Sequence, residues 1–483
     1  MAPSMLSSKS SKSGLHSSFD SGRTSSIASS SRSGSSHHPM GPKPFSPFKI
    51  LIVGAGVGGL MLGFCLEQAG IDYVILDKMR GPPTTKSTIQ MTGNTLRAIE
   101  QLGLLEEVMR IAKPVSSIVL RRPNMSTVGK IDTMYLKDRY GHYSCIVQRT
   151  ELCQLLLSRM PQEKIQWDRR VLEVVSGEIG VQCRCSNGHV EQADILIGAD
   201  GAHSSIRQNL YRTLREKHML PKSDAEPLKC IQNSIIGMTN PLDVERYPAA
   251  GARFSEVNII VGKEDGSHYT LWLSPASGNR VVWSVTGELL SPEDSDANFR
   301  QSEFGPEAVD AVCGLIQDLK TPFGCPLGDL IGQSQRDNIT KVMIEEKHYK
   351  TWFYGRTALI GEACHQFVPF SGQGAEQAIL DAVCLVNLLY KLDQNSLPDI
   401  IKAFQAYYDK RHQVLKTAFN VSSYMSNLMD SQGFTGELKR TMTFNMPSWV
   451  TNSSTDKIQV RPLLDFLPAV DDRGSKSVST KSV

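Results

Sequence analysis

The sequence predicts an α/β fold into which a second, mostly antiparallel sheet is inserted, followed by a C-terminal helical segment. Three observations predict this class. The apolar strand that starts at Lys49 runs into a glycine-rich turn, a helix and a second apolar strand, which is the pattern of a βαβ unit. Residues 228–342 form a series of half-buried strands, as in an antiparallel sheet. A long helical tract is then expected from Ala375 to about Met429.

The remaining elements follow from apolar periodicity. Residues at helical spacing predict helices over 59–69, 94–112 and 150–160. Short apolar runs predict strands over 73–78, 171–177, 181–188, 193–198 and 357–361, and over 233–239, 257–262, 268–274 and 280–289 in the inserted sheet. Alternating aromatic residues on strands usually pack a sheet, so we expect this role, in preference to a pocket, for Tyr269, Trp272 and Trp283.

The two ends of the chain differ in composition from the rest. Residues 1–47 are dominated by serine and cannot bury enough apolar surface to offset their ordering entropy, so we expect a disordered tail, and 471–483 form a similar one. Asp20 is the only acid in the first tail, which leaves mitochondrial targeting open beside the expected cytoplasmic location. The predicted divisions of the folded part are 48–227 for the first part of the α/β domain, 228–342 for the inserted substrate domain, 343–390 for the return to the α/β domain and 391–470 for the C-terminal helical region.

Charge and cysteine content exclude several classes of protein. The net charge of +3 is small for 483 residues and no basic run is interleaved with aromatic residues, so nucleic acid is not an expected partner. The ten cysteines include no CxxC pair, and Cys183 and Cys185 would share one face of a strand as reduced packing residues. No metal site and no transmembrane segment are predicted, because neither a ligand cluster nor about 18 continuous apolar residues occur.

The glycine-rich turn indicates where a dinucleotide would bind. Gly54, Gly56 and Gly59 stand where a turn must be tight, where backbone must approach a pyrophosphate, and where a helix must pack on a strand. The helix that follows offers free amides and the positive end of its dipole to phosphate. Asp77 ends the next strand, in the place of the acid that binds ribose hydroxyls.

A second motif follows the predicted strand at 193–198. Asp200 and Gly201 come at the carboxyl end of that strand, where open α/β sheets bind ligands, and Ser204 and Arg207 add polar and cationic groups. A structural alternative, compatible with a ligand role, is that Asp200 caps a helix starting near His203.

A third motif spans residues 359–375. Here Gly361 and Glu362 follow an apolar strand, and a helix is expected to begin near Ala375, where its amides would stabilise negative charge. His365 is expected to be a hydrogen-bonded structural residue more than an acid or base. The other residues singled out in this motif are Pro369, Gly372 and Gly374.

The three motifs, in this order over about 340 residues, resemble those of the group A FAD-dependent monooxygenases, whose fold is similar to that of 4-hydroxybenzoate hydroxylase. The resemblance implies a Rossmann-type FAD-binding domain with tightly bound, non-covalent FAD. It implies that Asp200 and Gly201 contact FAD near the NAD(P)H path, that Glu362 binds the ribityl chain in place of the usual aspartate, and that Pro369 lines the ring pocket. Gly372, Gly374 and Ala375 would then lie beside the flavin pyrimidine.

Two further flavin contacts come from the same resemblance. Arg149 corresponds to an arginine that reaches the ribityl and phosphate region, and its planar, permanently charged donor fork suits phosphate. Gln90 is placed near the flavin by resemblance alone. No catalytic side chain is assigned, because some relatives carry a tyrosine in a strand that here reads Ser234-Ile235-Ile236-Gly237.

The resemblance also implies an activity. NAD(P)H, bound transiently, would reduce FAD, oxygen would add at the flavin C4a atom, and the resulting hydroperoxide would hydroxylate or epoxidise a small organic substrate. Residues 445–450 and 461–468 are similar to the C-terminal part of fungal secondary-metabolite monooxygenases related to paxilline and meroterpenoid epoxidases. Two alternatives stay open, a flavin dehydrogenase or reductase without oxygen transfer and a non-catalytic flavin-binding protein, and a homodimer is also left open.

Overall fold

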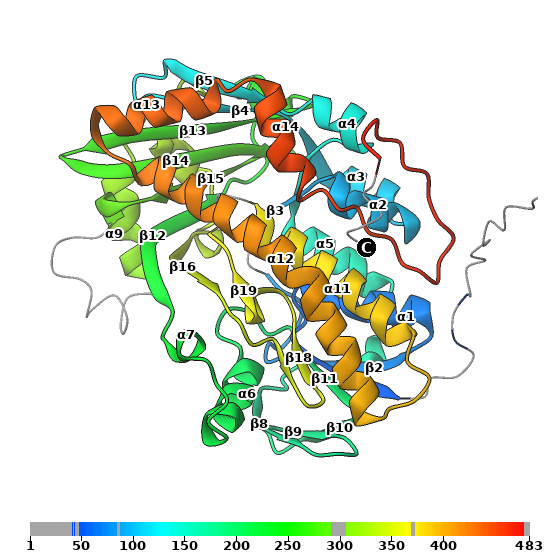
Figure 1. Cartoon of the computed structure of the whole chain (residues 1–483). Coiled ribbons are helices and arrows are strands. Elements are labelled where there is room, and N and C mark those ends of the chain that lie inside the picture. The colour runs from blue at the N-terminus through cyan, green and yellow to red at the C-terminus, as the bar shows by residue number, and fades with distance from the viewer. Residues whose placement is uncertain are drawn as a thin grey trace, which may run out of the picture. The chain divides into compact units, whose positions relative to one another are not determined.

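The computed structural model describes Gly41, Lys43 and residues 48–84, 87–290, 306–368 and 372–477 (Figure 1). All of them belong to one unit of the chain, Pro39–Val483. The tail expected over 1–47 lies outside the described residues except for Gly41 and Lys43, whereas residues 471–477 of the tail expected over 471–483 are described. Among the helices described, none combines the length and the apolar character that crossing a bilayer requires.

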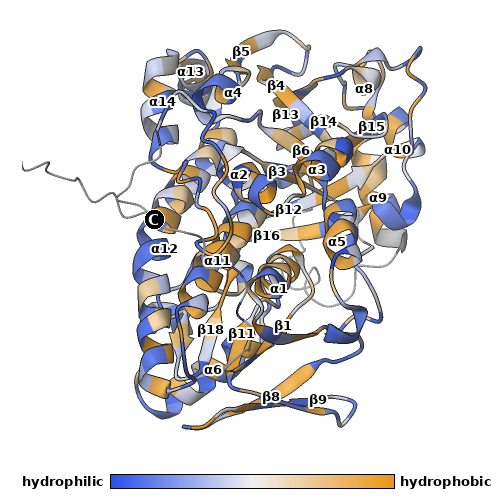
Figure 2. Cartoon of the chain, turned by 90° about the vertical axis from the view of Figure 1, so that its right-hand side faces the viewer, coloured by the Kyte–Doolittle hydropathy of each residue, from blue (hydrophilic) through white to orange (hydrophobic). Residues whose placement is uncertain are grey.

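A six-stranded, mostly parallel sheet forms the centre of the α/β part. Strand β1 (Lys49–Val53) pairs in parallel with β2 (Asp72–Leu76) and β11 (Ile195–Gly198). Helix α1 (Val57–Ala69) connects β1 to β2, and this confirms the predicted βαβ unit. Ile50, Leu51 and Ile52 of β1 are fully buried between the layers, and Figure 2 shows hydrophobic residues concentrated around β1, β11 and α1. In sheet order the strands are β17 (Phe353–Tyr354), β18 (Thr357–Leu359), β11 (Ile195–Gly198), β1 (Lys49–Val53), β2 (Asp72–Leu76) and β7 (Ile165–Gln166).

A small antiparallel sheet lies next in the chain, with the order β10 (Val190–Ala193), β9 (Val181–Cys185) and β8 (Val171–Ser176). Cys183 and Cys185 are both buried on one face of β9, while Gln182 and Arg184 between and beside them are exposed. Nine of the ten cysteines are free thiols. The side chain of the tenth, Cys230, is not among those that the structure describes. The packing role predicted for this pair is confirmed.

The other large sheet has ten strands, and almost all of its strand pairs are antiparallel. It draws on residues 88–148 and 365–366 as well as on the expected insert 228–342, because β13 pairs in parallel with β4 and β16 pairs with β19. Its strands are β3 (Thr88–Met91), β4 (Ala112–Arg121), β5 (Thr127–Asp132), β6 (Cys145–Gln148), β12 (Lys229–Met238), β13 (Ser255–Glu264), β14 (Ser267–Ala276), β15 (Arg280–Thr286), β16 (Thr340–His348) and β19 (His365–Gln366).

Two of the expected aromatic residues are core residues of this second sheet. Trp283 is fully buried and Tyr269 is nearly so, and both belong to the apolar cluster under the sheet. The indole nitrogen of Trp283 donates a hydrogen bond to Ser334 Oγ at 3.0 Å. Trp272 packs, partly buried, against a separate cluster that includes Phe444. These three side chains pack the sheet, as predicted.

Two helical tracts that were predicted to be continuous are each broken. The tract 94–112 divides into α2 and α3 at Gly103, whose φ of +74° is a left-handed conformation that ends a helix. The tract 375–429 divides into α11 and α12, because Ser396 accepts a hydrogen bond from Asp399 N and Pro398 occupies the first turn, a start signal for a new helix.

The helices pack on the sheets and against one another. Figure 1 shows the long α12 alongside α11, and α11 also packs on α1. The α-helices are α1 (Val57–Ala69), α2 (Gly93–Gln101), α3 (Leu105–Ile111), α4 (Tyr135–Tyr140), α5 (Arg149–Ser158), α6 (Ser205–Glu216), α7 (Lys222–Ala225), α8 (Pro248–Gly251), α9 (Pro306–Ile316), α10 (Leu327–Gly332), α11 (Gln373–Tyr390), α12 (Leu397–Asp430), α13 (Gly433–Phe444) and α14 (Ser448–Asp456). Short 3₁₀ turns are η1 (Gln162–Lys164), η2 (Glu288–Leu290), η3 (Arg336–Asn338) and η4 (Gly361–Ala363).

The end of the described chain returns to the α/β part. Asn94 holds this segment at two points, donating to Ile458 O at 2.9 Å and accepting from Arg461 N at 2.7 Å. Residues 471–477, which were expected to belong to the C-terminal tail, make defined contacts: Asp472 pairs with Arg461 and Ser475 N donates to Asp138 O at 2.8 Å.

Candidate cofactor site

The glycine turn after β1 has the geometry that its sequence predicts. Gly54 has a φ of +111°, and a Cβ there would lie 2.3 Å from the carbonyl oxygen of Ala199. A Cβ on Gly59 would lie 1.9 Å from the carbonyl oxygen of Gly54. Both glycines are therefore required by the turn itself and by the packing of α1 against it.

Gly56 differs from these two glycines. Its backbone is extended, with a φ of −79°, and the nearest atom to a Cβ placed on it is Arg149 Nη2 at 3.6 Å, an ordinary contact. The fold itself would accept a side chain at Gly56. A molecule bound against the backbone at Gly56 would collide with such a side chain. Gly56 also precedes the first turn of α1, which is not capped by a described side chain, so its amides are free for an anion.

Two adjoining cavities collect the residues that the three motifs predicted. The first has a volume of about 470 Å³ and the second of about 350 Å³, and both are lined by Gly56, Arg149, Ala199 and Gly201. The first also takes in Gly54, Asp77 and Asp200, and the second takes in Gln90, Glu362, Gly372, Gly374 and Ala375. Gly59 lies outside both walls as a packing residue, and Pro369 lies outside the described residues.

Charge in the first cavity favours a phosphorylated ligand. Its two acids are already bonded to backbone amides: Asp77 accepts from Ala55 N at 2.6 Å and from Met79 N at 2.7 Å, and Asp200 accepts from Ser205 N at 2.7 Å. The wall also carries the cationic side chains of Lys78, Arg149, Arg169 and Arg170. A dinucleotide with a pyrophosphate fits this donor set and the two adjoining cavities.

Asp200 caps a helix, which is the structural alternative that its sequence position left open. Besides Ser205 N, its carboxylate accepts from Ile206 N at 3.2 Å and from Ser205 Oγ at 3.0 Å, so it caps α6. Arg207, two residues into that helix, donates to Ala363 O at 3.0 Å and to Ala202 O. The second and third motifs are thus joined by one buried guanidinium, which also lies 4.4 Å from the ring centroid of Tyr349.

The side chain of Glu362, in the third motif, lies between Gly201 of the second motif and Gly374 of the third. This side chain is exposed to the second cavity, and its carboxylate oxygens lie 3.8 Å and 3.9 Å from the positions that a Cβ would take on Gly374 and Gly201. Gly372 has a φ of +62°, and a Cβ there would meet Gln90 Oε1 at 2.3 Å. The structure therefore brings Gln90 and Glu362 to the N-terminus of α11.

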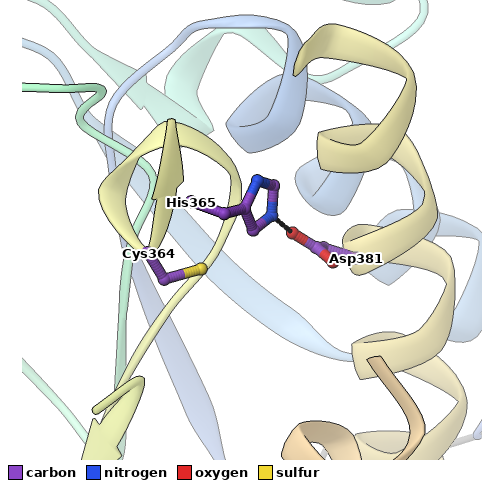
Figure 3. Close-up of side chains that lie close together, drawn as sticks. All are labelled: Cys364, His365 and Asp381. Carbon is purple, nitrogen blue, oxygen red and sulfur yellow. Dashed lines mark hydrogen bonds and ion pairs between the residues drawn. The ribbon is translucent and has the colours of Figure 1, made fainter. Parts of the chain in front are cut away.

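A buried network behind this turn fixes its conformation. Figure 3 shows His365 and Asp381 pointing toward one another from β19 and α11, and their Nε2 and Oδ2 atoms are 2.5 Å apart. Asp381 also accepts from Arg411 Nε at 2.8 Å. Burial alone would raise the pKa of Asp381, but His365 and Arg411 hold this pKa below its usual value. His365 is a hydrogen-bonded structural residue, as predicted.

Cys364, His365 and Asp381 lie close enough together to be considered as metal ligands. The thiol of Cys364 lies 3.4 Å from Leu359 O, to which it donates, and burial raises the pKa of this thiol well above its usual range. Since Arg411 already neutralises Asp381, a cation would gain little here. The cluster is a hydrogen-bonded support for the turn.

Arg411 was missed from the sequence. It lies in α12, some distance along the chain from the motifs, and its side chain is only 5% exposed. Because α12 contains many charged residues, the sequence did not single this arginine out. A signal did exist, because Tyr407, Arg411, Leu415 and Ala418 recur at helical spacing and all are buried. A lone arginine on an apolar helix face predicts a buried carboxylate partner.

Comparison with known proteins supports FAD as the cofactor. A model of the family described as an FAD binding domain matches residues 48–224 and 325–422. The FAD-dependent monooxygenase paxM of Penicillium paxilli is 27% identical over 390 residues, which cover 78% of this chain and 78% of that protein. The FAD-dependent monooxygenase ctvC of Aspergillus terreus is 26% identical over 399 residues, covering 80% of each chain.

Solved structures share the fold. Klebsiella pneumoniae HpxO, complexed with FAD and uric acid, superposes with a TM-score of 0.68 at 20% identity, covering 85% of this chain and 96% of that one. CtdE, in complex with FAD and its substrate, superposes with a TM-score of 0.65 at 15% identity, covering 85% and 97%. The family model matches most of the folded chain, so the chain belongs to the FAD binding domain family and its relatives are FAD-dependent monooxygenases, as its three motifs predicted.

Proposed function

We propose that this chain is an NAD(P)H-consuming monooxygenase of fungal secondary metabolism that hydroxylates or epoxidises a small organic substrate. The observation that carries the proposal is the convergence of three distant motifs on two adjoining cavities. FAD, when bound, supplies electron acceptance from the nicotinamide and oxygen activation at its C4a atom. The protein would bind FAD and the substrate, orient them, and exclude water from the reacting atoms.

Each cavity would hold one part of the cofactor. Gly56 and the free amides of α1 would receive the pyrophosphate, with Arg149 supplying positive charge between the two cavities. Asp77 would accept from ribose hydroxyls, and Glu362 would bond the ribityl chain. The N-terminus of α11 would face the flavin pyrimidine and stabilise its negative charge on reduction.

The second cavity suggests the character of the substrate. Beyond the proposed flavin contacts, its wall includes Ile236 of β12, Val342 of β16, and Phe367 and Val368 of the third motif. These side chains are apolar, so this part of the wall favours an apolar ring or alkene and keeps water from the reacting atoms. The two sheet strands would therefore determine substrate shape, while the motifs hold the cofactor.

The proposal is tested with purified full-length protein reconstituted with FAD. NADPH and NADH oxidation are measured with and without candidate aromatics and prenylated polyenes, and products formed under ¹⁸O₂ are analysed by mass spectrometry. We expect a substrate that accelerates nicotinamide oxidation and gains one labelled oxygen atom. Accelerated reduction without a labelled product would favour the dehydrogenase or reductase alternative, and a protein that binds no flavin would contradict all the enzyme assignments.

A further inference from the structure

Glu376 is a buried carboxyl group in the first turn of α11. The helix begins at Gln373, and Ala375, the residue before Glu376, lines the second cavity. The side chain of Glu376 is only 1% exposed. Its carboxyl group therefore lies within one helical turn of the place where α11 meets the cavity, but on the side packed against protein.

The partners of Glu376 come mainly from α2. Glu376 Oε1 accepts a hydrogen bond from Thr92 Oγ1 at 2.6 Å and from Thr92 N at 3.0 Å, and Thr95 Oγ1 lies at 3.5 Å. Gln459, in the C-terminal segment, donates in turn to Thr92 Oγ1 at 3.0 Å. Gln373, in the first turn of α11, is a further hydrogen-bond partner of the carboxyl group. Because the bonds from Thr92 and Thr95 converge on Oε1, a proton on Oε2 would leave those bonds in place. The same pocket can hold the charged and the neutral acid.

The surroundings make Glu376 sensitive to a nearby charge. Burial raises the pKa of Glu376 to about 7, although the hydrogen bonds from Thr92 act in the opposite direction. The neighbours from α2 and the C-terminal segment are uncharged, and the titratable group that faces it from β6 is Cys145, whose pKa burial raises to about 12. Of these groups, Glu376 is the one that changes charge near neutral pH.

Two negative charges would compete for the N-terminus of α11. The dipole and the free amides of this helix end stabilise the ionised Glu376, and they would equally stabilise the negative charge that a flavin at the cavity gains on reduction. In a low-dielectric site the two charges repel, which raises the proton affinity of the carboxylate. Protonation of Glu376 removes this repulsion.

We propose that Glu376 binds one proton from solvent when the flavin at the N-terminus of α11 is reduced, so that this helix end holds one negative charge in both redox states. The inference rests on the proposed function for the position of the flavin. Hydride transfer from the nicotinamide adds two electrons and one proton to the flavin and leaves it with one negative charge. The solvent proton converts the Glu376 carboxylate to the neutral acid, so the sum of the two charges is unchanged. Glu376 is thus a positioning residue for charge and not a group that touches substrate.

The test is the reduction potential of the bound flavin, measured spectroelectrochemically from pH 5.5 to 9 in the full-length holoprotein and in Glu376→Gln. We expect the two curves to coincide below pH 6 and to separate above pH 7, with the variant the more easily reduced. The separation should grow by up to a factor of ten in the reduction equilibrium for each pH unit, which is about 30 mV for a two-electron couple. Parallel curves over the whole range would overturn the proposal.

The matched control is Glu346→Gln. Glu346 on β16 is a half-buried carboxyl that bonds Ser423, and burial raises its pKa as well. We expect its curve to follow that of the wild type, and an equal separation in this variant would show a general charge effect and contradict a role specific to Glu376.

A second measurement needs no variant. Electrochemical reduction of the wild-type holoprotein at pH 8, in weak buffer with a pH indicator, should consume more than one proton for each flavin. Consumption of one proton or fewer would overturn the proposal even if Glu376→Gln failed to fold. A flavin that binds and supports oxygen transfer but shows parallel potential curves would contradict this inference alone. Protein that binds no flavin would contradict the proposed function together with it.

Discussion

The carboxylate of Asp381 accepts a hydrogen bond from the backbone amide of Gly361 at 3.0 Å. Gly361 has a φ of +60° and begins the turn that carries Glu362 into the second cavity, whereas Asp381 lies two turns into α11. Arg411 of α12 holds the other oxygen of the same carboxylate. One fully buried acid therefore fixes the proposed ribityl-binding turn relative to two helices.

Asp381→Asn should unfold the protein far more readily than its small change in shape suggests. The substitution leaves Arg411, which is 5% exposed, without its charged partner, and breaking such a buried pair costs about 3–5 kcal/mol. The measurement is urea unfolding of the flavin-free protein. Glu437→Gln, which removes the exposed partner of Arg122, is the control and should cost less than about 1 kcal/mol. Equal losses in the two variants would show that Asp381 is not a special support.

Gly56→Ala and Gly59→Ala should fail in different ways. A Cβ on Gly59 collides with backbone at 1.9 Å, so Gly59→Ala should lower the melting temperature of the flavin-free protein. A Cβ on Gly56 meets its nearest atom at 3.6 Å, so Gly56→Ala should melt like the wild type but bind FAD at least about tenfold more weakly, a loss of about 1.4 kcal/mol. Thermal melting and flavin fluorescence titration separate the two effects. If Gly56→Ala bound flavin with the affinity of the wild type, the pyrophosphate would not lie against Gly56.

Glu362→Asp should bind FAD as tightly as the wild type or more tightly. Glu362 is exposed to the cavity, and its oxygens lie 3.8 Å and 3.9 Å from the positions that a Cβ would take on Gly374 and Gly201, which carry none. The shorter acid therefore loses no packing against these glycines and restores the length usual in the family that the chain resembles. Glu362→Ala, which removes the acceptor, is the comparison and should weaken binding. Both affinities come from fluorescence titration. A large loss in Glu362→Asp would instead show that the pocket is built around the longer side chain.

Local features of this fold could be predicted from the sequence, while contacts between distant segments could not. The turn at Gly54 and Gly59 has a local signature, so its geometry followed from glycine spacing, although the backbone that crowds Gly54 belongs to Ala199, far along the chain. The break at Gly103 was visible as a glycine but was outweighed by the apolar periodicity on both sides. The parallel pairing of β13 with β4 joins residues more than a hundred positions apart, which periodicity does not encode.

The candidate site shows the same division. The motif residues were predicted because glycine turns and strand ends have local signatures. The support from Arg411 and the contact between Thr92 and Glu376 each join segments that are far apart in the sequence, and local spacing does not identify which residues pair. For Asp200 the sequence left two roles open, contact with a ligand and capping of a helix. Its hydrogen bonds show the helix-capping role.

Glu376→Gln should change how stability depends on pH. The pKa of Glu376 is about 7 in the folded protein, above its usual value of 4.5, so the folded state binds the proton more tightly than the unfolded chain does. The associated stability is complete below pH 4.5 and is lost as the pH rises through 7, a change of about 3 kcal/mol. Glutamine keeps the acceptor for Thr92 but cannot ionise, so the variant lacks this loss. Urea unfolding of flavin-free protein at pH values from 4 to 8 should therefore show the variant gaining on the wild type as the pH rises, with most of the gain between pH 4.5 and 7. A difference between the two proteins that stays constant with pH would mean that Glu376 does not titrate in this range.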